Sequence, residues 1–542
     1  RTSAPARIRD REFFMPGVWY KTNQDVSANA LAADPDAKVV LVREDRLPLP
    51  LVMVRDPATG STATLSHVHP DGATFTGEDF QSRIVDARMQ FGSMGVINDG
   101  HLQLAFQFPG TEGDRTYIHG DPKTGWALRS HPLAQGFSHH YQLRLAFDET
   151  SSGFPEALQA SWRKAFRDAS PQPPRADLDK VRSASVDLLG TYIHEYNGVP
   201  SVPFQAGLPD GEVKDTSSQM GFVGKALPSA ALLMAACLDQ EGKPTLEDDG
   251  LRASRLKNAT AVVDFWVQHS MNTSGVPKNW YNINTDGTVT WRSLPTHLRT
   301  ASDGLRGVLD AWRLLKKPEW LAYCRCFGDF LVAAQEEDGS IAGLWRWDGT
   351  PEKTFKNVTD HVIPFLVDLY QATHDGRYRL CAIQAGEYSL VAIDAPYRYR
   401  GGAADNPNVM DKEAGVLALA AFLALHDLTD DEKWVKPVAQ AGTFCETWTY
   451  AWDVPLPADD PKIVYPRCRT TLGASLIASG QSGADNFMAS AVHHYQRLHE
   501  LTAEQHFKDV ADFLEHATKQ LVDWDGALGY RYPGLLLEAF SL

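Results

Sequence analysis

Four carboxylates and one histidine in the second half of the chain could carry acid–base chemistry. Asp360 is followed at once by His361 at the mouth of a predicted helix, Asp405 lies in a Gly/Pro/Asn loop, and Glu413 and Asp485 lie near helix starts. Cleavage of a glycosidic bond usually takes two carboxyl groups, one protonated and one ionised. We therefore expect Asp360, His361, Asp405, Glu413 and Asp485 to supply the catalytic groups, and the sequence does not separate the acid from the base.

Acidic residues at helix starts also have a structural interpretation. Asp215, Asp303 and Asp411 lie where a carboxylate caps unpaired backbone N–H groups, contacts the helix dipole or packs. For these three we favour capping or packing over catalysis. Capping competes closely with catalysis for Asp485, which follows a Gly-Gln-Ser-Gly turn and precedes an apolar helix.

Aromatic residues interleaved with polar ones recur in four long loops. Sugars present flat C–H faces and hydroxyl groups, which Trp and Tyr rings and polar side chains bind well. The alternative is that these aromatic side chains plug the end of the helical array. The expected substrate-binding residues are Asn279, Trp280, Tyr281, Trp345, Arg346, Trp347, Tyr397, Arg398, Tyr399, Arg400 and Trp452.

The same loops could serve a β-elimination at a uronic acid. Such a lyase neutralises the uronate carboxylate, removes a carbon-bound proton and protonates the leaving oxygen. Arginine suits the carboxylate, because its planar fork binds both oxygens. The candidates are Arg346, Arg398, Arg400, Arg467 and Arg469 for the charge, His361 or His194 for the base, and Tyr281 or Tyr399 for the acid.

From about residue 178 to the C-terminus, the chain reads as helices joined alternately by short and long connections. In a ring of antiparallel helix pairs, this alternation places every long loop at one end, where binding and catalysis concentrate. Twelve segments have helical apolar periodicity. They are 156–168, 178–195, 216–240, 252–270, 299–316, 318–335, 360–374, 377–392, 412–426, 431–450, 483–500 and 504–521.

The first 150 residues follow a different pattern. Short apolar or alternating runs are separated by Gly, Pro, Asp and Asn clusters, which predicts strands and turns. We expect an N-terminal antiparallel β-sandwich over 1–150, a helix and Pro-rich linker over 151–177, and a helical catalytic domain over 178–542. The predicted fold class is mainly α with an all-β N-terminal part: an (α/α)6 barrel preceded by the sandwich.

This organisation, with the motifs Gly401–Asn408 and Ala478–Asp485, resembles the six-hairpin (α/α)6 toroid enzymes of carbohydrate metabolism. That group includes inverting glycoside hydrolases and polysaccharide lyases. The resemblance implies an enzyme that cleaves glycosidic bonds in a poly- or oligosaccharide. A glycoside hydrolase, exo-acting and acting on a uronic-acid-containing glycan, is the favoured interpretation, and a polysaccharide lyase is the alternative. The resemblance identifies no subfamily and transfers no catalytic residues.

Composition limits the partners. The net charge is −16 without a Lys/Arg-rich run, which weighs against nucleic acid, and no apolar stretch is long enough to insert into a membrane. The six cysteines are expected to be mostly buried free thiols. The chain opens without Met or an apolar signal segment, so we expect a processed, secreted or periplasmic protein. Nothing in the sequence predicts an oligomeric state.

No motif calls for an organic cofactor or a resident transition metal. Dinucleotide, P-loop, HExxH and paired CxxC motifs do not occur in the sequence. Oxygen ligands gather at Asp405, Asn406, Asn408 and Asp411, so a calcium ion is the one metal left open, although the spacing is not that of an EF-hand.

Overall fold

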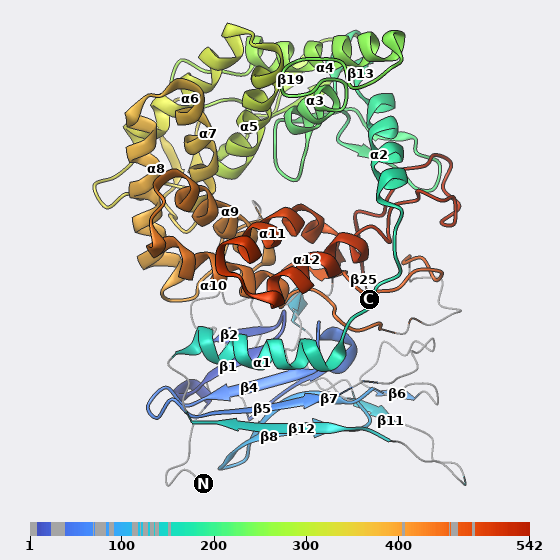
Figure 1. Cartoon of the computed structure of the whole chain (residues 1–542), viewed down its shortest axis with the longest axis vertical. Coiled ribbons are helices and arrows are strands. Elements are labelled where there is room, and N and C mark those ends of the chain that lie inside the picture. Colours follow the sequence, from blue (N-terminus) through green and yellow to red (C-terminus); the bar gives the residue numbers. More distant parts are fainter. Residues whose placement is uncertain are drawn as a thin grey trace.

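The computed structural model describes residues 8–22, 38–68, 70, 83–85, 91–110, 118–119, 121–122, 128–130, 135, 140–149, 153–403, 407–454, 456, 464–479 and 483–541. Within these residues the chain has an N-terminal all-β part and a larger helical part (Figure 1). The predicted class, mainly α with an all-β N-terminal part, is therefore confirmed.

The N-terminal part contains two antiparallel sheets. The five-stranded sheet has the order β12-β5-β4-β1-β2, and the three-stranded sheet has the order β3-β7-β8. Apolar side chains of both sheets, among them Phe13, Val52, Val42 and Met94, form one core between them. The strands are β1 Glu12–Met15, β2 Trp19–Lys21, β3 Val39–Arg43, β4 Leu51–Arg55, β5 Thr62–His67, β7 Ser93–Asn98, β8 Leu102–Gln107 and β12 Leu143–Asp148, with the short pairs β6 Arg83–Val85 with β11 Leu128–Ser130 and β9 Ile118–His119 with β10 Asp121–Pro122.

The described residues contain twelve α-helices. They are α1 Phe154–Ala169, α2 Leu178–Tyr192, α3 Ala226–Ala235, α4 Asp249–His269, α5 Leu298–Leu315, α6 Pro318–Ala334, α7 Ile363–Thr373, α8 Gly376–Ser389, α9 Lys412–Thr429, α10 Val435–Glu446, α11 Val492–Thr502 and α12 Gln505–Ala517. From α3 onward they form five consecutive hairpins, and α3, α5, α7, α9 and α11 pack one against the next.

The first helix corrects the predicted arrangement. Pairing the twelve predicted segments into six hairpins would place 156–168 in the ring, but α1 lies between the five-stranded sheet and the helical part (Figure 1). Its Phe166 packs on Phe513 of α12, and its Gln159 donates to Thr443 of α10 at 3.2 Å. The buried residues of α1 recur at helical spacing along one stripe, and this stripe lies where the two layers meet. The ring is completed instead by the segment after α12, whose Val522 packs with Val181 of α2.

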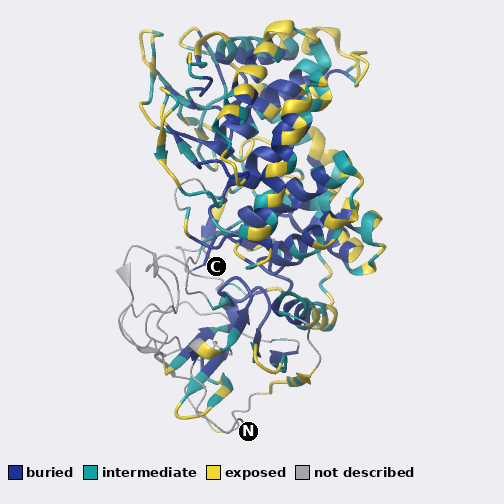
Figure 2. Ribbon diagram, turned by 90° about the vertical axis from the view of Figure 1, so that its left-hand side faces the viewer, coloured by how far each residue is buried: buried dark blue, intermediate teal, exposed yellow. Residues whose placement is uncertain are grey.

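The two parts share a buried junction. Tyr20 of β2 donates or accepts a hydrogen bond at 2.6 Å with Thr447 and stacks on Trp448, and Trp452 donates to the Leu47 carbonyl at 2.9 Å. Buried segments continue from the helical part into this junction (Figure 2). The sheets therefore support the loops that follow α10.

The long connections carry short strands. They are β13 His194–Tyr196, β14 Val199–Ser201, β15 Gln205–Ala206, β16 Val213–Asp215, β17 Ser218–Gln219, β18 Trp280–Ile283, β19 Val289–Trp291, β20 Thr296–His297, β21 Leu344–Trp345, β22 Pro351–Lys353, β23 Ser475–Leu476, β24 Gly483–Asp485 and β25 Ala539–Ser541. We call the end of the ring that carries them the rim. No helix among the described residues combines the length and apolar composition needed to cross a membrane.

Candidate active site

A cluster of charged and aromatic side chains lies at the N-terminal ends of alternate helices. Each of these ends follows a long rim connection, as the short/long alternation predicts. The contributors are Phe222 before α3, His297, Arg299 and Asp303 at α5, Asp360 and His361 before α7, Asp411, Lys412 and Glu413 at α9, and Asp485 and Phe487 before α11. Segments far apart in the chain thus meet at one place.

Arg299 is the centre of the cluster. Its buried guanidinium donates to the Glu413 carboxylate and to the Gly402 carbonyl, and its Nε lies 3.5 Å from Oδ2 of Asp303. The rings of Phe222 and Phe487 lie 4.5 and 5.4 Å from the guanidinium carbon. Since a planar cation can contact carboxylates at its edge and aromatic rings at its faces, Arg299 fixes both kinds of group.

The two carboxyl groups on Arg299 have pKa values moved in opposite directions. Burial raises the pKa of Asp303 above its ordinary value, although Arg299 opposes the shift. Burial acts the same way on Glu413, but there Arg299 and Lys412 outweigh it and the pKa lies below its ordinary value. The Asp303 side chain is 24% exposed and that of Glu413 8%. The proton is therefore held more readily by Asp303 than by Glu413, and such a difference suits a pair that acts as acid and base.

A second ion pair lies beside the first. The fully buried Lys412 ammonium binds Oδ2 of Asp485 at 2.7 Å. Oδ1 of Asp485 accepts from the Ser475 hydroxyl at 3.0 Å and from the Phe487 N–H at 2.9 Å. Asp485 therefore both caps the turn that begins at Phe487 and pairs with Lys412, which gives the capping interpretation a physical basis.

Asp411 is the N-cap of α9, the role that its position predicts. Its carboxylate accepts from the backbone N–H of Ala414 at 2.7 Å and of Gly402 at 3.0 Å. A Cβ at Gly402 would lie 2.2 Å from the Ala414 nitrogen, so this contact requires glycine. Burial and the neighbouring Glu413 raise the pKa of Asp411 to about 7.

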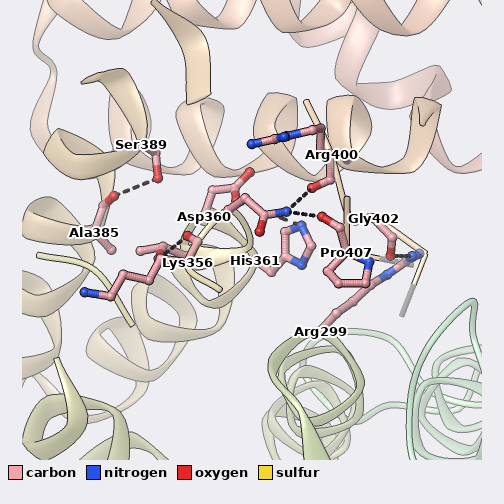
Figure 3. A network of polar contacts seen from close by, with 12 residues as sticks. Arg299, Lys356, Asp360, His361, Ala385, Ser389, Arg400, Gly402 and Pro407 are labelled. Carbon is pink, nitrogen blue, oxygen red and sulfur yellow. Dashed lines mark hydrogen bonds and ion pairs between the residues drawn. The ribbon is translucent and has the colours of Figure 1, made fainter. Parts of the chain in front are cut away.

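Asp360 and His361 are buried in the turn Thr359–Val362 (Figure 3). Burial, and to a smaller extent Asp411, raises the pKa of Asp360 to about 8. Within the described residues, Oδ1 of Asp360 and both ring nitrogens of His361 have no hydrogen-bond partner, and His361 Nε2 lies 3.9 Å from Asp360 Oδ1. Asn357 ties this turn to the next loop by donating to the carbonyls of Arg400 and Pro407 at 2.9 and 2.7 Å.

His297 forms a second buried imidazole next to His361, with ring centroids 6.3 Å apart. Its Nδ1 accepts from the Arg299 N–H at 3.2 Å, so the neutral ring carries its proton on Nε2, which has no partner in the described part of the chain. Burial and Arg299 lower the pKa of His297 to about 3, and burial, His297 and Arg299 lower that of His361. Both rings are neutral at pH 7.

Strained backbone supports the aromatic edge of the cluster. Phe222, Val223 and Gly224 have φ values of 74°, 49° and 68° immediately before α3. Left-handed backbone is unfavourable for Phe and Val and costs roughly 1–3 kcal/mol per residue. This turn holds the Phe222 ring over Arg299.

Five of the predicted substrate-binding aromatics are not exposed. Tyr281, Trp345, Tyr397, Tyr399 and Trp452 are all buried. Tyr281 donates to the Pro200 carbonyl at 3.1 Å, Tyr399 to Asp394 at 2.6 Å, and Trp345 to the Ala342 carbonyl. The prediction that they are exposed platforms is wrong, because their polar atoms and rings bind rim loops to the helices. For these residues the alternative of packing holds.

The remaining predicted residues are dispersed. Trp280 is half-buried, stacks on Phe204 and donates to Ser217 at 3.0 Å. Asn279 is buried and donates to the Pro295 carbonyl at 3.3 Å. Arg346 is exposed and pairs with Glu352 at 2.5 Å, Trp347 is half-buried, Arg398 is exposed, and Arg400 is half-buried. The prediction for Asp405 lies outside the described residues.

Two of the lyase candidates lie elsewhere. His194 is exposed on β13 and stacks on Tyr196, and Arg469 pairs with Asp525 at 2.6 Å. No group of three or more His, Cys, Asp or Glu among the described residues is arranged to hold a metal ion. The proposed calcium ligands Asp405 and Asn406 fall outside these residues.

Sequence reasoning missed Arg299, His297, Lys412, Phe222 and Phe487 as site residues. The available signal was a charged or aromatic residue within one turn of the start of alternate helices, on a face that is otherwise apolar. Charges at such positions were interpreted as helix caps, which is their commoner role.

A cavity of about 230 Å³ lies between α1 and strands β5 and β12. Two of its polar lining residues, Thr64 and Ser161, are hydrogen-bonded at 2.9 Å, and its Arg144 pairs with Asp168 outside the cavity. It contains none of the rim cluster, so we place the candidate active site at the cluster.

Comparisons with known proteins reach only the fold. No family model matches the chain, and no curated protein matches it. It is similar to D-mannose isomerase, with 11% identity and a TM-score of 0.48 over 67% of this chain and 90% of that chain. It is also similar to cellobiose 2-epimerase from Bacillus thermoamylovorans B4167, with 10% identity and a TM-score of 0.44 over 67% of this chain and 88% of that chain. A third similar structure is a family 76 glycoside hydrolase from a bovine Bacteroides thetaiotaomicron strain, with 12% identity and a TM-score of 0.41 over 87% of this chain and 96% of that chain. All three names are those of carbohydrate enzymes. Likenesses this distant add nothing to the chemistry, which rests on the side chains above.

Proposed function

We propose that the chain is a carbohydrate-active enzyme that hydrolyses glycosidic bonds at the rim cluster. The observation that carries the proposal is the pair of carboxyl groups, Asp303 and Glu413, that share Arg299 and have pKa values moved apart. A carboxyl group with a raised pKa keeps a proton for the leaving oxygen. A carboxylate with a lowered pKa stays ionised to activate water or attack the sugar.

Arg299 fixes the spacing of this pair. It lies in the first turn of α5 and reaches Glu413 in the first turn of α9 and Asp303 one turn further along α5. Phe222 and Phe487 both lie near its guanidinium and are half-buried, so each ring keeps exposed surface. An aromatic face at that position suits the C–H face of a sugar.

This proposal changes the expected proton donor. Asp360 carries a raised pKa, but its side chain is only 2% exposed, whereas that of Asp303 is 24% exposed. A donor must come within hydrogen-bond distance of the leaving oxygen. We therefore assign the acid role to Asp303 and the ionised role to Glu413, and no longer assign catalysis to Asp360.

A second candidate function rests on His297 and His361. Two neutral imidazoles with unpartnered nitrogens within the described residues could remove and return a carbon-bound proton, as in sugar isomerisation or β-elimination. The Tyr acids expected for the lyase are not available, since the Tyr281 and Tyr399 hydroxyls are buried and donate to other groups.

One experiment separates these functions. The protein is incubated in deuterated buffer with neutral and uronate-containing glycans, while reducing ends, the ultraviolet absorbance of an unsaturated uronate and carbon-bound deuterium are followed. New reducing ends alone support hydrolysis. Ultraviolet absorbance or deuterium on a sugar carbon moves the assignment to the histidines. No change in any glycan contradicts both.

A further inference from the structure

An open cavity of about 430 Å³ lies at the rim between two loops that the proposed reaction does not use. One wall is the segment between β19 and β20, and the other is the β21–β22 hairpin. The lining residues are Ser293, Leu294, Pro295, Arg346, Trp347, Asp348 and Glu352. The volume falls within the usual range of small-molecule sites, about 300–1,000 Å³.

The hairpin wall is held rigidly. Gly349, with φ 85°, donates to the Arg346 carbonyl at 3.0 Å and closes the turn. Asp348 accepts from the N–H and the hydroxyl of Thr350 at 2.9 and 2.6 Å, and Ser274 donates to the Trp347 carbonyl at 2.7 Å. The Trp347 side chain is therefore presented by a preformed turn rather than by a loose loop.

The lining is suited to an uncharged, hydroxyl-rich ligand. Trp347 contributes an aromatic ring whose buried Nε1 has no partner among the described residues, and Leu294 beside it is 46% exposed. The charged lining side chains are Arg346, which pairs with Glu352, and Asp348, so the sum is one negative charge. Such a lining disfavours an anionic sugar and offers a ring face and carboxylate acceptors to a neutral one.

The cavity lies close to the candidate active site along the chain. Pro295 lies two residues before His297, about 7 Å along an extended strand. Strand β20 pairs with β21 through Thr296 and Trp345, which places the hairpin beside it. A ligand of several sugar units could contact both places.

We infer that this cavity is an accessory subsite that binds neutral sugar units of a glycan at a distance from the bond that is cleaved. This inference rests on the proposed function for its link to catalysis, but binding at the cavity can be measured without turnover. Trp347 is the residue that recognises the sugar face.

The test measures binding by the Glu413→Gln protein, in which turnover is suppressed, and by the same protein carrying Trp347→Ala or Leu294→Ala. The probes are neutral gluco-, manno- and xylo-oligosaccharides of two to six units, and the method is calorimetry. Because Trp347→Ala removes a ring that stacks on sugar, we expect it to weaken binding of the longer oligosaccharides about tenfold and to leave binding of the shortest unchanged. Tyr532→Ala, at another exposed aromatic position, is the control and should change nothing.

The inference is overturned if Trp347→Ala leaves the affinity for every length the same as in the Glu413→Gln protein, or if the Glu413→Gln protein binds none of the series. The two proposals fail separately. If no glycan is cleaved but length-dependent binding is lost with Trp347→Ala, the subsite stands and the hydrolase assignment falls. If cleavage occurs and Trp347→Ala leaves KM unchanged for every length, the subsite falls alone.

Discussion

Arg299 and Glu413 lie 114 residues apart and form a buried ion pair that joins the N-terminal ends of α5 and α9. A buried pair gains little net stability over an apolar one, but removing one partner typically costs about 3–5 kcal/mol because a charge stays buried alone. The Arg299–Glu413 ion pair therefore contributes little to stability. Because Asp303 contacts the same guanidinium, the arrangement is best explained by the acid–base chemistry of Asp303 and Glu413.

Arg299→Gln should raise the pKa of Glu413, because burial then acts without its main opposing cation. Glu413 would lose its proton at a higher pH, so the acid limb of the kcat/KM profile should move to higher pH. The measurement is the pH dependence of kcat/KM of a folded variant. Arg306→Gln, which breaks an ion pair with Asp368, is the control. If the acid limb of the kcat/KM profile is unchanged in both variants, Glu413 is not the group whose ionisation the reaction requires.

Asp360→Asn should change how stability depends on pH. The pKa of Asp360 is about 8 in the folded protein against 3.8 as its ordinary value. Between these values the folded state holds a proton that the unfolded state has lost, so this group lowers stability as pH rises, by up to about 1.4 kcal/mol per pH unit.

The variant lacks this group, so its free energy of unfolding relative to the unsubstituted protein should increase from pH 4 to pH 8. Urea unfolding at several pH values measures the difference. A difference that stays constant over this window would mean that Asp360 is ionised in the folded protein.

Tyr281→Phe should leave activity within a factor of two and cost about 1 kcal/mol of stability. It removes the hydrogen bond to the Pro200 carbonyl and a longer one, 3.4 Å, to the Ser201 hydroxyl, and it keeps the ring against Trp266. A lyase that uses this hydroxyl as its acid would lose on the order of a hundredfold or more in kcat. Steady-state kinetics and thermal unfolding decide between these outcomes.

Val223→Gly should stabilise the protein by about 1 kcal/mol, because Val223 has φ 49° and is 44% exposed. Val391→Gly is the matched control: that valine is 76% exposed in the π-helical turn Leu390–Asp394, where glycine should destabilise. Thermal unfolding measures whether each substitution raises or lowers the stability. Destabilisation by Val223→Gly would show that its side chain, rather than the Phe222 contact, holds the turn.

Helices were predictable where apolar periodicity and caps agree. Segments 299–316 and 318–335 correspond closely to α5 and α6. Segment 216–240 failed as a single helix, because Gly221 and Gly224 flank the left-handed turn and only Ala226–Ala235 is helical. Local pattern also could not place α1, whose partners in the sheet and in α12 lie far away in sequence.

The sequence predicts the location of the candidate site better than it predicts which residues form it. Alternating loop lengths indicated the rim, and Glu413 and Asp485 lie in the cluster. Trp280 and Tyr281 are neighbours with similar side chains, but Tyr281 is buried and Trp280 is only half-buried. The sequence does not reveal this difference in burial. Arg299 acquires its role only from Glu413 and Phe487, which α9 and the turn before α11 bring to it.

The most direct test of the hydrolase assignment compares kcat of Asp303→Asn, Glu413→Gln, the double variant and the exposed control Glu387→Gln on a glycan that the protein cleaves. Each single variant should lose about 10²- to 10⁴-fold and the double variant little more than the worse single one, because the two groups act as a unit. Near-normal kcat in either folded single variant would contradict the assignment.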